Sequence, residues 1–178
     1  MAVSHTTSSP KVASPIADFL DGIVLAAGKV FAWSYVVLMA VIITQVVLRY
    51  GFNHGLVLLE ELQWHLYAVG VMFGISYAQV TNSHIRVDIF HMRFQRRTQH
   101  IWEILGILLL MMPFIYVVFD GSLPFVYDSW RINESSASPT GLPYRWLIKS
   151  VIPISFGLLF IAALARLIRE ITGLVKGE

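Results

Sequence analysis

The sequence LVLLEELQWHLYAVGVMFGISYAQVTNSHIRVD, residues 56–88, decides the fold class of this chain. It begins with two acidic residues, continues as a long apolar stretch and ends in a polar corner. The strongly polar side chains within residues 62–78 are Gln63, His65 and Ser76, so this segment is close to the minimum length that crosses a bilayer. Four such segments in one chain predict an integral membrane protein.

The composition points the same way. Of the 178 residues, 56% are hydrophobic and 13% are charged, whereas a soluble domain has about 25% charged residues. The net charge of +2, without a basic tract interleaved with aromatics, argues against a nucleic-acid partner. The sequence has no cysteine, which excludes disulfides, cysteine-bound metals and a cysteine nucleophile.

We expect an all-α membrane protein with one domain of four transmembrane helices over residues 18–178, preceded by a mobile cytoplasmic tail over residues 1–17. A short amphipathic cytoplasmic connection is expected between the second and third helices. Pro113 predicts a kink in the third helix, because proline removes one helix hydrogen bond. The four spans are expected at residues 18–49, 56–79, about 98–119 and 147–167.

Charge predicts the orientation in the membrane. Four spans place both termini and the 80–100 connection on one side, and nine of the 13 Lys and Arg residues belong to that side. Basic residues favour the cytoplasm, so both termini are expected there. The connection has apolar residues on two nearly opposite faces, which indicates either a segment between lipid and another protein surface or an irregular elbow. Its four arginines would face anionic head groups.

Two acidic residues open the second predicted span. A carboxylate within a spanning segment is unfavourable and usually has a partner. Arg49 lies on the other side of a short turn, so a helical hairpin brings it within reach of Glu60 or Glu61. These charges either hold the hairpin together or dock a partner subunit. The alternative is a pair of solvated acids among the lipid head groups.

Small residues follow along the same span. Gly70, Gly74 and Ala78 form a stripe at intervals of four, which allows close approach of another helix, either of this chain or of a partner. His65 is the one histidine well inside a predicted span. A b-type haem needs facing histidines as axial ligands, and the other spans supply none. A hydrogen-bonded packing histidine is the ordinary interpretation.

The third and fourth predicted spans are joined by an outer loop over residues 121–146. Its tryptophans and tyrosines, including Trp130, fit an aromatic belt at the membrane interface. Glu134, followed by two serines, either caps a turn or meets a partner. Neither a Gly-rich phosphate loop nor a Ser-His-Asp arrangement is apparent, so we expect no catalysis by this chain.

These motifs resemble the small membrane subunit, the DctQ-like component, of tripartite ATP-independent periplasmic (TRAP) transporters. The resemblance covers almost the whole chain from the first span onward. The segments that carry it are Arg49, Glu60-Glu61-Leu62, Gly74, the corner His84-Ile85-Arg86-Val87-Asp88, Ser129-Trp130, Glu134-Ser135, Gly141-Leu142-Pro143 and the run from Trp146 to Pro153.

The resemblance implies a scaffold in the bacterial inner membrane. It implies a much larger membrane subunit that moves the substrate with a sodium gradient, and a periplasmic binding protein that delivers the substrate, commonly an organic acid. The sodium site belongs to the large subunit, so no cofactor is expected in this chain. Arg86 and Asp88 join Arg49, Glu60 and Glu61 as charges expected at the subunit interface or in the hairpin.

Two other functions stay open at this point. The chain could be the haem-binding membrane anchor of a redox enzyme, which would give the purified protein a Soret band. It could also be a freestanding small carrier or channel, which would transport solute in liposomes without any companion.

Overall fold

The computed structural model describes residues 14–83 and 95–176, and within these ranges the chain is helical, without a β-strand. The all-helical fold expected from the sequence is confirmed. The elements are α1 (Pro15–Gly51), α2 (Val57–Thr81), α4 (Arg96–Gly106), a π-helical turn η1 (Ile107–Met111), α5 (Met112–Arg131) and α6 (Arg145–Lys176).

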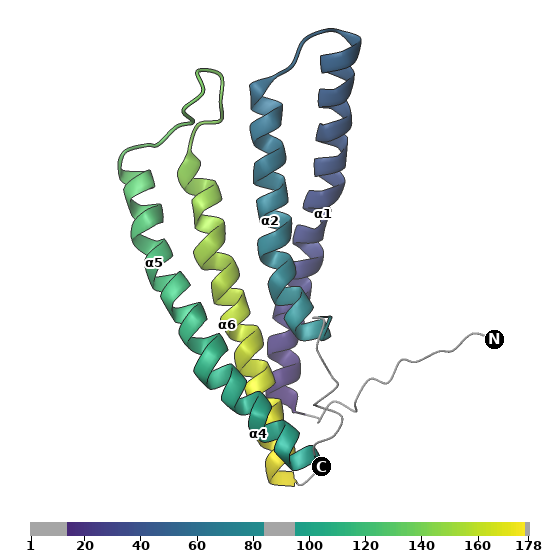
Figure 1. Ribbon diagram of the computed structural model, residues 1–178, viewed down its shortest axis with the longest axis vertical. Coiled ribbons are helices and arrows are strands. Elements are labelled where there is room, and N and C mark those ends of the chain that lie inside the picture. The colour runs from purple at the N-terminus through teal and green to yellow at the C-terminus, as the bar shows by residue number, and fades with distance from the viewer. Residues whose placement is uncertain (1–13, 84–94, 177–178) are drawn as a thin grey trace, which may run out of the picture.

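The helices form two antiparallel pairs. α1 packs along α2 and α5 packs along α6, and the pairs meet where α6 contacts α1 and α2. The start of α1 and the end of α6 lie at the same end of the bundle as α4, and the pairs separate towards the other end (Figure 1). We call the end with α4 the inner end, and the end with the α1–α2 turn the outer end.

Three segments are long and apolar enough to cross a membrane, by length and composition: α1, the continuous run Arg97–Arg131, and α6. The second predicted span, α2, is not among them. It lies between α1 and α6, so part of its surface contacts protein. Its buried Ser76, for example, donates a hydrogen bond to the Ser155 carbonyl oxygen of α6 at 3.2 Å.

The helices are longer than the sequence predicted. α1 begins at Pro15, because proline fits the first turn of a helix, so residues 15–17 are not part of a tail. Residues 1–13, the rest of the predicted tail, lie outside the described residues. The predicted outer loop is wrong over residues 121–131, since α5 continues to Arg131 through Pro124. Membrane helices tolerate an internal proline because neighbouring groups satisfy the freed backbone.

At Pro113 the third span changes its hydrogen-bond pattern. The π-helical turn η1 ends two residues before Pro113, at Met111, and α4, η1 and α5 follow one another as one continuous run of helix (Figure 1). Pro113 has no N–H to donate to the carbonyl of Leu109, four residues earlier. A π-helical turn is one recognised way to accommodate an irregularity inside a helix.

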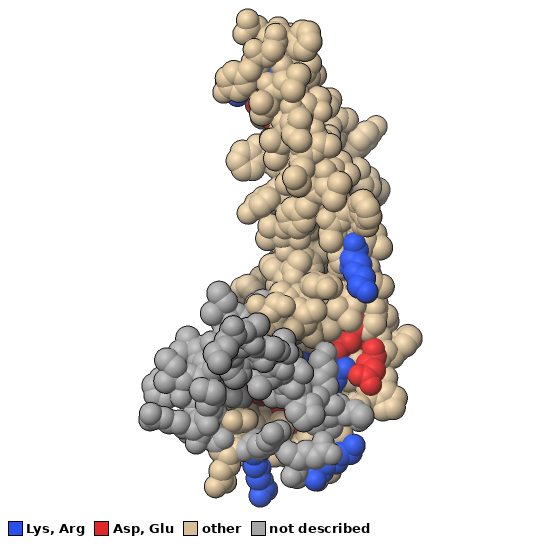
Figure 2. All heavy atoms as spheres, turned by 90° about the vertical axis from the view of Figure 1, so that its right-hand side faces the viewer, with Lys and Arg blue, Asp and Glu red and all other residues tan. Residues whose placement is uncertain are grey.

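Little of the apolar surface is buried within the chain. One cluster joins η1 and α5 to α6, and a smaller one joins Val24, Val80 and Ala162 from three helices. Most large apolar side chains are exposed, among them Trp33 and Ile43 of α1. Figure 2, which faces the α1 side, shows an uncharged surface over most of the length of the bundle. Such a surface needs lipid or another protein to cover it.

Candidate functional site

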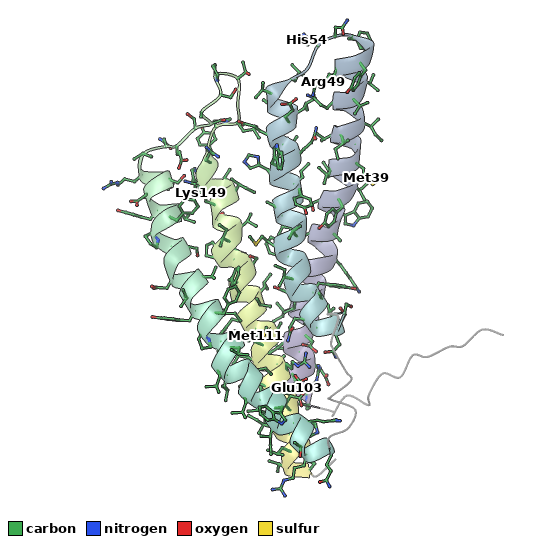
Figure 3. All side chains as sticks on the ribbon, viewed as in Figure 1. Met39, Arg49, His54, Glu103, Met111 and Lys149 are labelled. Carbon is green, nitrogen blue, oxygen red and sulfur yellow. The ribbon has the colours of Figure 1, made fainter. Side chains whose placement is uncertain are left out.

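Charged side chains gather at both ends of the bundle and join different helices there. In Figure 3, Arg49 and His54 lie near the outer end of the α1–α2 pair, Lys149 lies near the start of α6, and Glu103 lies towards the inner end. These two charged ends are the candidate functional sites, because each holds carboxylates that bind partners on other elements of the bundle.

Arg49 and Glu60 meet across the turn between α1 and α2. Arg49 Nη1 lies 3.7 Å from Glu60 Oε1. The buried Gln45 donates from Nε2 to the same carboxylate oxygen at 3.2 Å, and its Oε1 accepts from the Leu56 N–H at 3.4 Å. The Arg49 and Glu60 side chains are 63% and 47% exposed, and an exposed pair is worth at most about 1 kcal/mol.

Glu61 faces a different neighbour, the loop between α5 and α6. Its carboxylate accepts hydrogen bonds from the Ser136 hydroxyl and, at 2.6 Å, from the Leu142 N–H. Hydrogen bonds to a charged acceptor are stronger than neutral ones. Gly141 allows this approach, because a Cβ atom there would lie 2.7 Å from Glu61 Oε1 and would collide with Ser136. Glu61 therefore ties the loop to α2.

Glu134 holds the same loop to the start of α6. The Lys149 ammonium donates to its carboxylate, and Arg145 Nη1 lies 3.9 Å away. The Lys149 ammonium also lies over the ring of Phe125 in α5, 4.0 Å from its centroid. The hydrogen bond from Lys149 holds the pKa of Glu134 below its ordinary value. The Glu134 carboxylate is therefore ionised near neutral pH and paired with Lys149.

At the inner end, Arg169 joins α6 to α1. Its guanidinium donates to Asp18 at 2.6 Å and also to Asp21. The Arg169 side chain is 14% exposed and that of Asp21 is 8% exposed. One arginine side chain can donate to two carboxylates because its guanidinium group carries five N–H donors. This contact is more buried than the Arg49–Glu60 pair at the other end.

Arg166 lies one turn earlier on α6 and reaches two further elements. It pairs with Glu103 of α4 at 2.9 Å and donates to the Asn82 side chain, just beyond α2, at 3.0 Å. Glu170 completes the group, since the His100 Nδ1–H donates to its carboxylate at 2.6 Å. The sequence counts these two arginines of α6 only among the basic residues of the inner side, because no local pattern joins Arg169 to Asp18 and Asp21, which lie 151 and 148 residues earlier.

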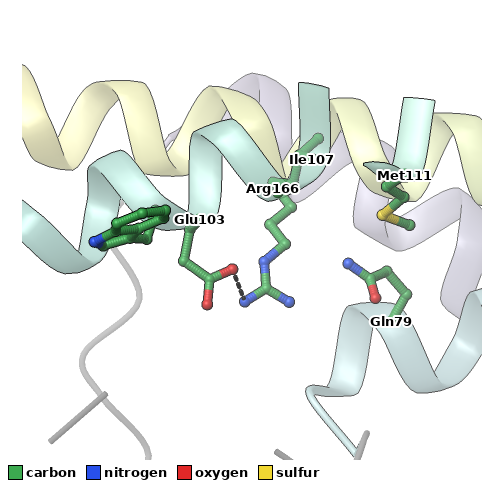
Figure 4. A pocket seen from close by; sticks show the side chains of 7 residues that line it. Gln79, Glu103, Ile107, Met111 and Arg166 are labelled. Carbon is green, nitrogen blue, oxygen red and sulfur yellow. Dashed lines mark ion pairs between the residues drawn. The ribbon is translucent and has the colours of Figure 1, made fainter. Parts of the chain in front are cut away.

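A cavity of about 460 Å³ opens beside this inner group. The Glu103–Arg166 pair forms one side of it, and Gln79 of α2 extends into it from the opposite side (Figure 4). The π-helical turn contributes apolar lining. The residues that line it are Gln79, Trp102, Glu103, Gly106, Ile107, Met111 and Arg166.

The predicted stripe of small residues divides into two environments. At Gly70, a Cβ atom would lie 2.6 Å from the ring of Tyr35 in α1, so this glycine permits close contact within the hairpin. At Gly74 an added Cβ atom would meet nothing within 4 Å. Ala78 is half-buried. Sequence reasoning missed Gly28, which accommodates Tyr77 in the same way as Gly70 accommodates Tyr35.

The remaining predicted residues are placed as follows. Trp130 lies in the last turn of α5 and not in a loop, and it is exposed beside Tyr127. The Nδ1–H of His65 donates to the Glu61 carbonyl in its own helix at 2.6 Å. Arg86 and Asp88, with the predicted amphipathic connection, lie outside the described residues. Within residues 14–83 and 95–176, no group of three or more His, Asp or Glu side chains could hold a metal ion.

The fold and these contacts define a helical membrane protein whose helices are joined by charged groups at both ends. Residues 38–173 match the family described as tripartite ATP-independent periplasmic transporters, DctQ component, and the chain belongs to this family. A Haemophilus influenzae protein provisionally named as a TRAP transporter small permease protein is 29% identical over 153 residues, which cover 84% of this chain and 91% of the relative. The family resemblance found in the sequence is confirmed, and the family is a transporter component rather than an enzyme.

Proposed function

We propose that this chain is the small subunit of a TRAP transporter and crosses the inner membrane four times. The fourth crossing is α2, which runs along α1 in the opposite direction (Figure 1). In this proposal α1 crosses from the inner end to the outer end, and the chain then crosses back through α2. The third span, which starts with α4, can therefore begin at the inner end. Contacts of α2 with α1 and α6 shelter its polar side chains from lipid.

The inner end faces the cytoplasm in this proposal. The start of α1, the start of α4 and the end of α6 all lie there (Figure 1). Nine of the 13 basic residues belong to that side by sequence, and basic residues favour the cytoplasmic side of a membrane. Both termini are therefore cytoplasmic, and the α5–α6 loop faces the periplasm.

Within the transporter, the chain acts as a rigid brace. The observation that carries this role is that charged groups join the two helical pairs at both ends. Glu61 binds the α5–α6 loop at the outer end, and Arg169 binds Asp18 and Asp21 at the inner end. Separating the pairs would break these contacts together, which favours one fixed arrangement of the helices.

The other functions of the transporter belong to its partners. A larger membrane subunit moves an organic acid with a sodium gradient and holds the sodium, and a periplasmic binding protein delivers the substrate. The description of the family, as one component of tripartite periplasmic transporters, supports partners of this kind. This chain contributes a surface that stays fixed while the moving part of the large subunit changes position during transport.

Isolation from native membranes tests the proposal. In a mild detergent, the tagged chain should co-purify with a larger membrane subunit, and proteoliposomes should take up substrate only when both subunits and the binding protein are present. Uptake by liposomes that contain this chain alone would contradict the proposal. So would a Soret band in the purified chain, which would indicate a haem-binding anchor instead.

A further inference from the structure

An acidic residue far from the end of α5 lies on the outside of the bundle. Asp120 is exposed, and its side chain has no hydrogen-bond or ion-pair partner among the residues that the structure describes. It lies eleven residues before Arg131, the end of α5, which corresponds to about 16 Å along the helix. Residues 104–119 before it and 121–127 after it carry no charged side chain. Asp120 therefore interrupts a long uncharged surface.

The position of Asp120 on α5 directs it away from its own chain. The buried residues Ile115, Ser122 and Ser129 recur every seven residues and define the inward face of α5. Asp120 precedes Ser122 by two residues, which places it about 160° round the helix from that face. The exposed Tyr116, one turn earlier, shares this outward surface.

A second acceptor lies on the same turn. Pro124 is inside α5, four residues after Asp120, and has no N–H. The main-chain carbonyl of Asp120 therefore lacks the donor that an ordinary residue at position 124 would supply. One residue thus presents a carboxylate without a partner among the described residues and a backbone oxygen that has lost its ordinary helical donor. In lipid an unsatisfied polar group of either kind is strongly unfavourable.

Among the residues that the structure describes, the cations of this chain do not supply these donors. Lys149, on the neighbouring helix α6, is bound to Glu134. Lys29, an exposed cation of α1, offers a contrast. A lysine side chain is long enough to carry its charge to the membrane interface, whereas the aspartate side chain is short.

We propose that the outward face of α5 around Asp120 binds the large membrane subunit, through a Lys or Arg of that subunit that donates to the Asp120 carboxylate and to the carbonyl freed by Pro124. The inference rests on the proposed function, since it names the surface by which this chain meets its partner. A cation is the complementary group because both oxygens are acceptors, and a guanidinium or ammonium offers several donors at once.

Substitution tests the charge. In a co-expressed complex with the large subunit, Asp120→Asn should weaken the affinity between the subunits about 30-fold or more, the size expected when a buried charge pair loses one member. The matched control is Asp128→Asn, because Asp128 is also exposed on α5 but lies only three residues from its end. The control should keep normal recovery. Equal recovery of the Asp120→Asn complex would overturn the proposal.

A photo-cross-linking amino acid at Tyr116 tests the surface without removing Asp120. It should capture the large subunit, whereas the same group at the exposed Ile43 of α1 should not. Capture from Ile43 alone, or of a second copy of this chain from Tyr116, would overturn the docking face while leaving the small-subunit function intact. If the unaltered chain never co-purifies with a large subunit, the proposed function itself fails.

Discussion

The two ends of the bundle join the same helical pairs with different chemistry. At the outer end, the Arg49–Glu60 pair is largely exposed and Glu61 holds a loop partly through a backbone N–H. At the inner end, Arg169 and Asp21 are nearly buried, and one guanidinium serves two carboxylates. Between the two helical pairs, the inner end joins helix to helix, whereas the outer end joins a helix to a loop.

This difference indicates where the bundle is most tightly held. Figure 1 shows the helical pairs close together at the inner end and apart at the outer end. Removing one member of a buried pair leaves an uncompensated charge, but an exposed charge is still solvated. We therefore expect substitutions to be more disruptive at the inner end than at the outer end.

The largest effect is expected from Arg169→Ala. It leaves the buried Asp21 without its cation, so the free energy of unfolding should fall by about 3–5 kcal/mol. Thermal unfolding of the purified complex in detergent measures the loss. The matched control is Lys176→Ala, at an exposed position in the last turn of α6, which should change little. Equal stability of the two variants would remove the proposed difference between the ends.

Gly70→Ala should have the next largest effect. Its added Cβ atom would lie 2.6 Å from the ring of Tyr35, so that ring or the contact between α1 and α2 would have to shift, and overpacking of this kind typically costs about 1–3 kcal/mol. Gly74→Ala is the control in the same helix, because its Cβ atom would meet no other atom within 4 Å. Chemical denaturation of both variants measures the difference. Equal losses would show that Gly70 does not mark a closer approach than Gly74.

Glu61→Gln should loosen the outer loop without unfolding the helices. The neutral amide accepts a weaker hydrogen bond from the Leu142 N–H than the carboxylate does. Hydrogen exchange at Leu142 should accelerate by about an order of magnitude, while exchange in the middle of α6 stays the same. Arg49→Gln is the control, because Arg49 does not contact the loop residues bound by Glu61. Unchanged exchange at Leu142 would contradict this role for Glu61.

The smallest effect is a pH dependence at Glu134. Because its pKa is lower in the folded chain than when unfolded, its contribution to stability is fully present at neutral pH. The contribution should decline as the pH falls below the ordinary glutamate range towards the lowered pKa. Unfolding measured between neutral and acidic pH should show this decline, and Glu134→Gln should reduce it. An identical pH profile in the variant would exclude Glu134 as its source.

Several features of the site could be read from the sequence because they are local. The turn after Arg49 brings α1 and α2 together, so the sequence alone predicts a charged contact between Arg49 and Glu60 or Glu61. Periodicity alone could not choose between the two acids, which point about 100° apart on a helix. The structure places Glu60 beside Arg49, and Glu61 against the loop near Ser136.

Other features depend on contacts between distant segments. Asp18 and Arg169 are 151 residues apart in the chain, so no local pattern joins them. The end of α5 was misjudged because Pro124 and its neighbours resemble a soluble turn, whereas a membrane helix accommodates the proline. The stretch from which the fold was predicted, α2, is not among the segments long and apolar enough to cross a membrane, and it packs between α1 and α6.

The most direct test of the bracing role is transport with the two helical pairs locked together. The chain contains no cysteine, so the double variant Glu61→Cys, Ser136→Cys would carry two cysteines only. A short bifunctional maleimide can link these two cysteines, because the native residues at both positions contact each other. In proteoliposomes with the large subunit and the binding protein, we expect the locked chain to support the same uptake as the unlinked double variant. Loss of uptake on cross-linking would show that the pairs move during transport and would contradict a rigid brace.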